Sequence, residues 1–154
     1  MSDAKETSNT LVMETSKGNV TINLRPDLAP NHVEQIKALA SEGFYDGIIF
    51  HRVIDGFMAQ VGCPHGTGTG GSDKPNLKAE FNEEKHVRGT CSMARSASPD
   101  SANSQFFICF DEAPFLNGQY TVWGEVVEGM DVVDQLEKGE PVANPDKIIS
   151  MKVA

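Results

Sequence analysis

The chain lacks the features that mark membrane and secreted proteins. None of its apolar runs approaches the roughly 18 residues that a membrane-spanning helix needs. Its first ten residues, MSDAKETSNT, lack the basic and apolar regions of a signal peptide. Its three cysteines are an odd number without the spacing of a disulfide scaffold, so we expect reduced thiols. These absences predict a cytoplasmic protein with no membrane partner.

Basic residues are also scarce. Thirteen Lys and Arg stand against 22 Asp and Glu, which gives a net charge of −9 at pH 7. Such a chain repels phosphate backbones, so nucleic acid is not an expected partner. The 154 residues contain no repeat and no linker. We therefore predict a polar N-terminal tail over residues 1–10 and a single domain over residues 11–154, and nothing in the pattern indicates more than a monomer.

Short apolar patterns predict mostly strands. Residues 11–24, LVMETSKGNVTINL, alternate around the turn SKGN and predict a hairpin. Further strands are expected within residues 47–63, 88–95, 104–110, 120–127 and 146–154, and helices within 29–43 and 129–139. Asn31 is a candidate cap of the first helix. Many strands and two separated helices favour a closed or nearly closed antiparallel barrel, with the helices covering its openings, because closure removes exposed edges.

A Gly-, Ser- and Pro-rich stretch, residues 66–81, is predicted to be a long surface loop. Its GTGTGG motif resembles a phosphate-binding loop but lacks the lysine of GxxxxGK[ST], which disfavours a nucleotide site. Just before it, Cys63 and His65 are potential metal ligands together with Cys91. Their spacing matches no standard zinc pattern, so we expect neither metal nor cofactor.

Strand alternation places polar and aromatic residues together outside the core. In residues 104–110, SQFFICF, Phe106 and Ile108 share one face, whereas Gln105 and Phe107 share the other. In residues 50–62, FHRVIDGFMAQVG, the same alternation groups Met58 with Gln60. If these strands adjoin, they form an apolar hollow with a single cation, lined by Arg52, Met58, Gln60, Gln105 and Phe107. Such a hollow suits a neutral, partly apolar substrate with carbonyl groups.

Arg52 is the unusual member of this set. It lies between apolar residues, where a half-buried guanidinium without a partner would cost several kcal/mol. Either a carboxylate or a ligand is therefore expected to pair with it. Its neighbour His51 points to the opposite face and is interpreted as structural. The predicted turn at Asp55 and Gly56 leaves the face of Phe57 open.

Five motifs occur in order from about residue 11 to the end: FHRVIDGFMAQVG, GTGTGG, SMAR, SQFFI and FLNGQYTVWGEVVEGMDVV. Together they resemble the cyclophilin family of peptidyl-prolyl cis-trans isomerases, in particular its small, bacterial-like, single-domain members. The resemblance implies a mainly β fold, a closed eight-stranded antiparallel β-barrel capped by two α-helices, with an active groove on its outer surface. It also implies acceleration of X-Pro bond rotation in proline-containing polypeptides, assistance to protein folding, and no cofactor.

The resemblance assigns roles to individual residues. Arg52 corresponds to the catalytic arginine of the family, so its partner is expected to be a substrate amide instead of a carboxylate, with Gln60 positioning the guanidinium. The implied substrate-binding residues are Phe57, Met58, Gln60, Ala94, Arg95, Ser96, Gln105, Phe107, Phe115, Leu116 and Tyr120. Among these, residues 94–96 match the segment whose backbone pairs with an extended peptide.

Some positions depart from the family pattern. Phe115 replaces a common tryptophan and Tyr120 a frequent histidine, so binding of cyclosporin-type cyclic peptides is expected to weaken more than isomerase activity. Arg95 stands where asparagine is common, which leaves the preference for residues next to proline open. A non-catalytic module that holds proline-containing segments in the same groove is the main rival function, and a nucleotide-binding protein is a distant third.

Overall fold

The computed structural model describes residues 9–68, 70–140 and 142–153. The predicted polar tail over residues 1–10 lies outside this part of the chain except for Asn9 and Thr10, and the first strand already begins at Thr10. None of the helices in the described ranges is long and apolar enough to cross a membrane.

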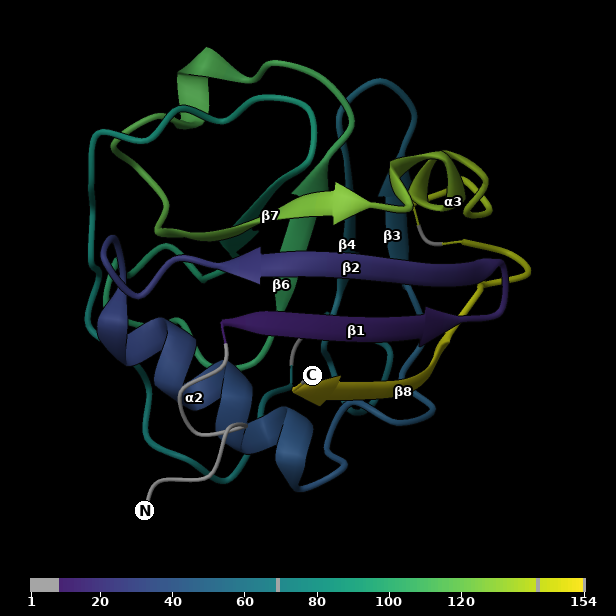
Figure 1. The fold of residues 1–154 in the computed structure, drawn as a ribbon, viewed down its shortest axis with the longest axis horizontal. Helices are drawn as coiled ribbons and strands as arrows, with labels where there is room; N and C mark the ends of the chain where they lie inside the picture. The colour runs from purple at the N-terminus through teal and green to yellow at the C-terminus, as the bar shows by residue number, and fades with distance from the viewer. Residues whose placement is uncertain (1–8, 69, 141, 154) are drawn as a thin grey trace.

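Eight strands form one sheet in the order β3-β4-β6-β5-β7-β2-β1-β8, and every paired neighbour is antiparallel. In Figure 1, β7, β2, β1 and β8 run across the front, whereas β6, β4 and β3 cross behind them, so the sheet is strongly curled. The elements are β1 (Thr10–Thr15), β2 (Gly18–Leu24), α2 (Pro30–Ser41), β3 (Arg52–Ile54), β4 (Met58–Val61), β5 (Thr90–Met93), β6 (Phe106–Cys109), the 3₁₀ turn η1 (Pro114–Leu116), β7 (Val122–Glu128), α3 (Met130–Asp134) and β8 (Ile148–Val153).

The sheet is an open half-barrel, and the prediction of a closed barrel was wrong. Its two end strands, β3 and β8, are not neighbours in the strand order of the described sheet. The segment before β3 does reach the start of β8: Ile48 O accepts from Ile148 N–H at 2.8 Å, and Phe50 N–H donates to Asp146 O at 2.8 Å. The outer edge of β3 is occupied instead by a loop: Val53 N–H donates to Gly139 O at 2.9 Å, and Gly139 N–H donates to Val53 O at 2.8 Å. This loop therefore pairs with the backbone of β3 at the edge where a closing strand would otherwise lie.

The core fills the concave side of the curled sheet. The predicted hairpin is confirmed, and its alternate residues Leu11, Met13, Val20 and Ile22 are fully buried. At the centre, the Phe106 ring meets the Trp123 ring edge-on at 5.3 Å between centroids. These contacts bury the apolar face that the alternation predicted.

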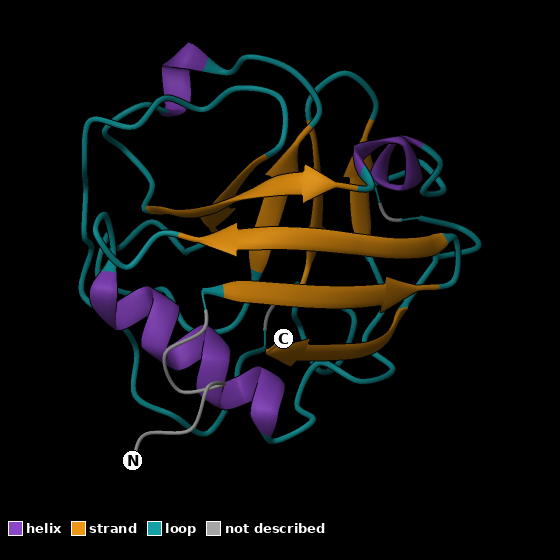
Figure 2. Ribbon diagram, viewed as in Figure 1, coloured by secondary structure: helices purple, strands orange, loops and turns teal. Residues whose placement is uncertain are grey.

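The two helices lie at opposite ends of the curled sheet (Figure 2), and buried residues of both belong to the same main core: α2 packs against β8 and β7, and α3 packs against β2. The predicted cap of α2 was wrong, because Ala29 is the N-cap and has no side-chain hydrogen bond. Instead, the Glu80 carboxylate of the long loop accepts from Asn31 N–H at 3.3 Å and His32 N–H at 2.9 Å. A carboxylate that is distant in the sequence thus accepts hydrogen bonds from backbone N–H groups in the first turn of α2, and it holds the long loop against the helix.

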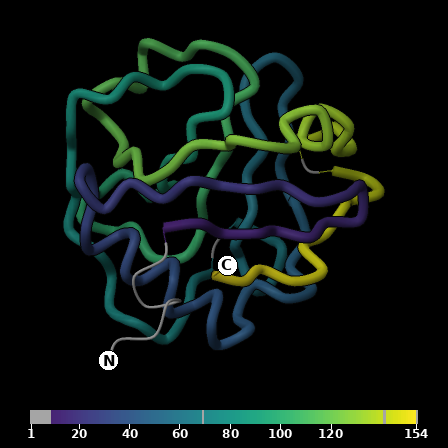
Figure 3. Tube along the Cα trace, viewed as in Figure 1, coloured from purple at the N-terminus to yellow at the C-terminus, as the bar shows by residue number. Residues whose placement is uncertain are grey.

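The long connection from β4 to β5, residues 62–89, follows the outside of the molecule and appears as the teal stretch at the left edge of Figure 3. Gly62 starts it with a φ of +108°, and a Cβ at this position would collide with the Ser104 carbonyl oxygen. Only glycine satisfies both conditions. This close approach holds the loop against the segment that leads into β6.

Candidate functional site

The site begins at the hairpin of β3 and β4. Arg52 is paired with Gln60 across this hairpin, and Ile54 is paired with Met58. The predicted turn is present: Gly56 adopts a φ of +74°, and Phe57 N–H donates to Ile54 O at 3.0 Å. The hairpin register therefore places Arg52 directly beside Gln60.

Strand β4 also pairs with β6. The sequence predicted a shared hollow on the condition that these strands adjoin, and this pairing meets it. Gln60 faces Phe107 and Met58 faces Cys109 in this ladder. Arg52, Gln60 and Phe107 consequently form one row across three neighbouring strands. The row lies on the convex side of the sheet, because the intervening residues Ala59 and Ile108 belong to the main core.

A second apolar cluster covers this convex side, apart from the main core. Met58, Phe107 and Leu116 are 3%, 5% and 8% exposed. Above them lies a hollow of about 150 Å³, lined by Arg52, Phe57, Met58, Gln60, Ala94, Arg95, Phe107, Leu116 and Tyr120. Every residue of this lining was among the predicted site residues, but the lining contains two guanidiniums, those of Arg52 and Arg95, so the prediction of a single cation was wrong.

Aromatic rings packed against one another form part of the wall of the hollow. The Tyr120 ring meets the Phe107 ring edge-on at 5.7 Å, and the Arg95 guanidinium lies 4.6 Å from the Tyr120 centroid. His86 stacks behind Phe107 at 6.1 Å, and its Nε2 lies 2.9 Å from Ser92 Oγ. Burial lowers the pKa of His86. Sequence reasoning missed this histidine, because it lies in the irregular loop before β5.

Phe115 does not line the hollow. Its side chain is 68% exposed and its ring packs against Phe57 at 5.6 Å between centroids. It therefore extends the rim, whereas its neighbour Leu116 faces inward. The two residues are consecutive in the 3₁₀ turn η1, so their side chains point in different directions.

Arg52 has a carboxylate partner, although the resemblance favoured a substrate amide in place of one. Its Nε donates to Glu140 Oε2 at 2.6 Å, and its Nη1 donates to Gln60 Oε1 at 3.3 Å. Glu140 lies 88 residues away in the sequence, in an irregular segment, and sequence reasoning missed it. The Arg52 side chain is 38% exposed, so this pair sits at the edge of the hollow rather than in the interior.

An ordered series of amides continues from Arg52. Gln60 Nε2 donates to Gln105 Oε1 at 2.9 Å, and Gln105 Nε2 donates to the carbonyl oxygens of Gly68 at 3.0 Å and Gly70 at 2.9 Å. Because those two carbonyls accept only, the Gln105 amide has one possible orientation. That orientation in turn fixes Gln60 with its oxygen toward Arg52.

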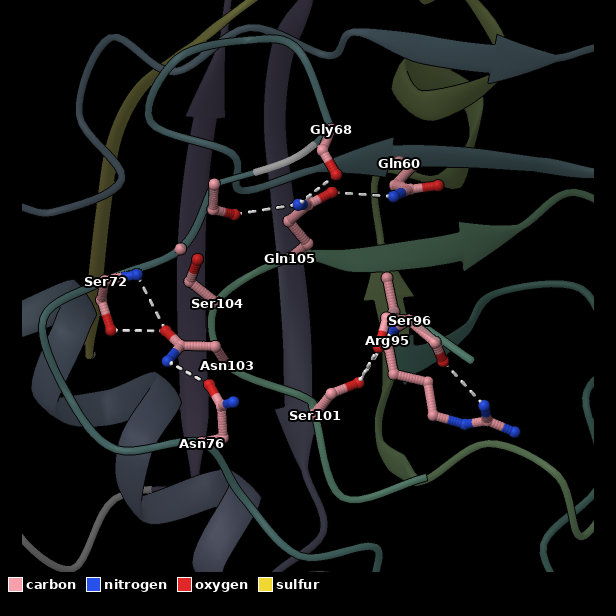
Figure 4. A pocket seen from close by; sticks show the side chains of 13 residues that line it. Gln60, Gly68, Ser72, Asn76, Arg95, Ser96, Ser101, Asn103, Ser104 and Gln105 are labelled. Carbon is pink, nitrogen blue, oxygen red and sulfur yellow. Dashed lines mark hydrogen bonds between the residues drawn. The ribbon is translucent and has the colours of Figure 1, made fainter. Parts of the chain in front are cut away.

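A larger, polar hollow of about 570 Å³ adjoins the apolar one, and the two share Gln60, Ala94 and Arg95. Figure 4 shows Gln105 between Gln60 and Gly68 at one side, and Asn103 bonded to Ser72 and Asn76 at the other. The predicted residues Ser96 and Gln105 lie here, not in the apolar hollow.

Residues 94–96 form the ridge between the hollows. Ala94 N–H donates to Gln105 O at 3.0 Å and Ser96 N–H donates to Ser101 Oγ at 2.9 Å. The Arg95 side chain donates to Gln119 O and Ser96 O. Among the hydrogen bonds of the described residues, none uses the Arg95 backbone N–H.

The potential metal ligands Cys63, His65 and Cys91, and the histidine His51, are not part of the lining of either hollow. In the described part of the chain, no group of three or more His, Cys, Asp and Glu side chains is arranged to hold a metal ion. Burial alone would raise the pKa of the Cys63 thiol, but backbone N–H groups led by that of Gly70 lower it to about 6. His51 is 7% exposed, and burial, followed by the charge of Arg52, lowers its pKa.

The sequence resembles known proteins over almost its whole length. Residues 10–153 match the family described as cyclophilin type peptidyl-prolyl cis-trans isomerase/CLD. A probable peptidyl-prolyl cis-trans isomerase of Brucella suis is 54% identical over 166 residues, covering 97% of this chain and 85% of the relative. Peptidyl-prolyl cis-trans isomerase B of Bacillus subtilis is 45% identical over 122 residues, covering 79% of this chain and 85% of that protein.

Solved structures agree with these relatives. The cyclophilin AquaCyp293 of Hirschia baltica superposes with a TM-score of 0.88 at 34% identity, covering 95% of this chain and 74% of that chain. A Cryptosporidium parvum cyclophilin, crystallised in the presence of the dipeptide Ala-Pro, superposes with a TM-score of 0.87 at 29% identity, covering 94% of this chain and 98% of that chain. The chain belongs to the cyclophilin family of peptidyl-prolyl cis-trans isomerases.

Proposed function

We propose that the apolar hollow binds the proline of an X-Pro segment and that Arg52 catalyses rotation about the bond before it. The observation that carries this proposal is the placement of the Arg52 guanidinium beside Gln60 at the edge of a hollow of about 150 Å³ lined largely by apolar side chains, whereas the second guanidinium of the lining, that of Arg95, lies over the Tyr120 ring. A proline ring is apolar and compact, and its amide supplies the only polar groups that Arg52 needs to meet.

The reaction breaks no bond, which suits the residues at hand. Rotation must pass a barrier of about 20 kcal/mol because the amide loses its resonance, and it takes tens to hundreds of seconds unaided. In the twisted transition state the prolyl nitrogen becomes pyramidal and accepts a hydrogen bond, which the planar ground states cannot do. A donor aimed at that nitrogen lowers the barrier selectively. A reduction of about 7 kcal/mol corresponds to roughly a 10⁵-fold acceleration.

One nitrogen of Arg52 has no hydrogen-bond partner among the described residues and is available for this task. Its Nε and Nη1 are bound to Glu140 and Gln60, whereas its Nη2 makes no hydrogen bond among the described residues. In the proposal Nη2 faces the substrate, while Phe57, Met58, Phe107, Leu116 and Tyr120 hold the ring. Phe115 extends the apolar surface beyond Phe57.

The ridge and the polar hollow bind the rest of the peptide in this proposal. The free N–H of Arg95 pairs with a peptide carbonyl, and the polar surface of Ser96 and Gln105 receives side chains next to the X-Pro unit. The Ala-Pro dipeptide present with the Cryptosporidium cyclophilin supports a proline-containing ligand of this kind.

Further expectations belong to the same proposal. The clients are flexible or unfolded polypeptides in the cytoplasm, and the chain acts as a monomeric single domain whose folding assistance comes from X-Pro rotation. Binding of cyclosporin-type cyclic peptides is weakened, because Phe115 offers no indole N–H. Nucleic acid, metal and cofactor have no part in the reaction.

Exchange spectroscopy tests the proposal without a coupled protease. An Ala-Pro peptide in slow cis-trans exchange should show strong exchange cross-peaks when about one hundredth of an equivalent of protein is added, because catalysed turnover becomes faster than the mixing time. Shifted peptide resonances without exchange cross-peaks would instead identify the rival, a binding module that does not catalyse. A titration with ATP and GTP that leaves the protein spectrum unchanged would dispose of the nucleotide alternative.

A further inference from the structure

We propose that Glu140 is a positioning residue, which holds the Arg52 guanidinium in its catalytic orientation from the side opposite Gln60. The inference rests on the proposed function of Arg52 as the donor to the prolyl nitrogen. Its basis is the direct bond from Arg52 Nε to Glu140 Oε2 at 2.6 Å, which is short for a charge-assisted hydrogen bond.

The backbone that carries Glu140 is fixed to the strand that carries Arg52. Gly139 exchanges two hydrogen bonds with Val53, at 2.9 and 2.8 Å, and Val142 N–H donates to His51 O at 3.1 Å. Residues adjacent to both sides of Arg52 are thus tied to the segment around Glu140. A carboxylate on such a segment is placed by backbone pairing and not only by its own flexible side chain.

Two contacts define the plane of the guanidinium, whereas one does not. Gln60 holds Nη1, and with that bond alone the planar fork can still swing about the contact. The second bond, at Nε, removes this freedom and leaves Nη2 without a hydrogen bond among the described residues. Arginine has about 2 kcal/mol of rotamer entropy to lose, so restriction before the substrate arrives makes the transition-state contact more favourable.

The effect should appear in turnover and not in substrate affinity. The planar X-Pro amide offers its nitrogen no hydrogen bond, so the direction of Nη2 matters only once the bond twists. The carboxylate of Glu140 is 59% exposed, and solvent screens its charge. The size of the effect is therefore limited to that of a good exposed ion pair.

The test compares three variants of the full chain on an Ala-Pro peptide. Glu140→Ala should lower kcat about fivefold, equivalent to about 1 kcal/mol, with KM almost unchanged. Glu140→Gln keeps an acceptor oxygen and should recover part of the loss. Glu137→Ala is the matched control, because Glu137 is also exposed, at 51%, but pairs with Lys17 at 3.1 Å and leaves Arg52 untouched.

A second readout follows Arg52 itself. In the unaltered protein the Arg52 Nε–H resonance should be resolved and slow to exchange with water, as expected for a bonded donor, and Glu140→Ala should speed that exchange while Glu137→Ala does not. Equal kcat in the two alanine variants, or a rise in KM with kcat unchanged, would overturn the positioning role. Absence of acceleration by the unaltered protein would instead overturn the proposed function, and this inference with it.

Discussion

The apolar hollow and the polar hollow share Gln60, Ala94 and Arg95 but are built in different ways. The apolar hollow takes its floor from strands β4 and β6, whose register fixes Met58, Gln60 and Phe107 in place. The polar hollow takes most of its lining from loops, which are held by side-chain bonds such as those from Ser72 to Asn103.

This difference indicates a division of labour. A rigid sheet surface suits a step that needs atomic precision, such as the proposed donation from Arg52 to a twisting amide. Loops with many exchangeable hydrogen bonds suit the binding of varied neighbouring residues. We therefore expect changes in the apolar hollow to alter turnover, and changes in the polar hollow to alter which peptides are preferred.

Among changes to the walls and floor of the two hollows, the strongest effect should come from Phe107→Ala. Phe107 is 5% exposed and forms the floor of the apolar hollow, so its loss should cost about 3 kcal/mol of unfolding free energy and lower kcat/KM about a hundredfold. Urea denaturation and exchange spectroscopy measure the two effects. The matched variant is Asn103→Ala in the polar hollow, which should leave turnover of a minimal Ala-Pro peptide nearly intact. Equal losses of activity would break the division between the hollows.

Acid should lower the free energy of unfolding through His86, the buried histidine behind Phe107. Burial lowers the pKa of His86, and also those of His32 and His51. Below the unfolded-state pKa of about 6.5 the unfolded chain takes up protons that the folded chain refuses, so the unfolding free energy should fall as the pH drops from 7 toward 5. The slope is at most about 1.4 kcal/mol per pH unit for each proton taken up.

Urea midpoints at several pH values measure this dependence, and His86→Gln should reduce the slope. A stability that stays constant from pH 7 to pH 5, or a slope unaffected by His86→Gln, would contradict the assignment. Carboxylates such as Asp134, whose pKa Arg88 lowers, act in the same direction only at more acidic pH.

Gln105→Leu should lower kcat about tenfold through Gln60. Without Gln105 the Gly68 and Gly70 carbonyls no longer determine the orientation of the Gln60 amide, and its oxygen is free to leave Arg52. Because Gln105 lines the polar hollow, a loss confined to KM would show that it acts as a binding residue only. Progress curves at several peptide concentrations separate the two constants.

Arg95→Ala should have the smallest effect, and a selective one. Among the described residues Arg95 forms no ion pair, and its guanidinium lies over Tyr120 on the ridge. Its charge should favour peptides with an acidic residue before the X-Pro unit by about threefold at low salt, and the variant should lose this preference. Competition between Glu- and Ala-containing peptides measures it. An unchanged preference would exclude Arg95 as its source.

The same two regions explain what the sequence could predict. The period-two alternation of strands grouped Phe107 with Gln105 and Gln60 with Met58, and the pairing of β4 with β6 meets the condition under which Gln60 and Phe107 share one surface. Glu140, Glu80 and His86 all lie in irregular segments, where no periodicity indicates the direction of a side chain. Their contacts with Arg52, α2 and Phe107 depend on tertiary packing across long sequence separations. The closed barrel failed for the same reason, because an irregular loop pairs with β3.

Arg52→Ala, assayed for rate and affinity in one exchange-spectroscopy titration, tests the central claim most directly. If Arg52 acts on the twisted amide, the catalysed exchange rate should fall at least about a hundredfold while peptide affinity changes less than about threefold. If affinity and rate fall together, Arg52 only holds the peptide. If the rate persists, Arg52 takes no part in turnover. Either result would contradict the catalytic role assigned to it.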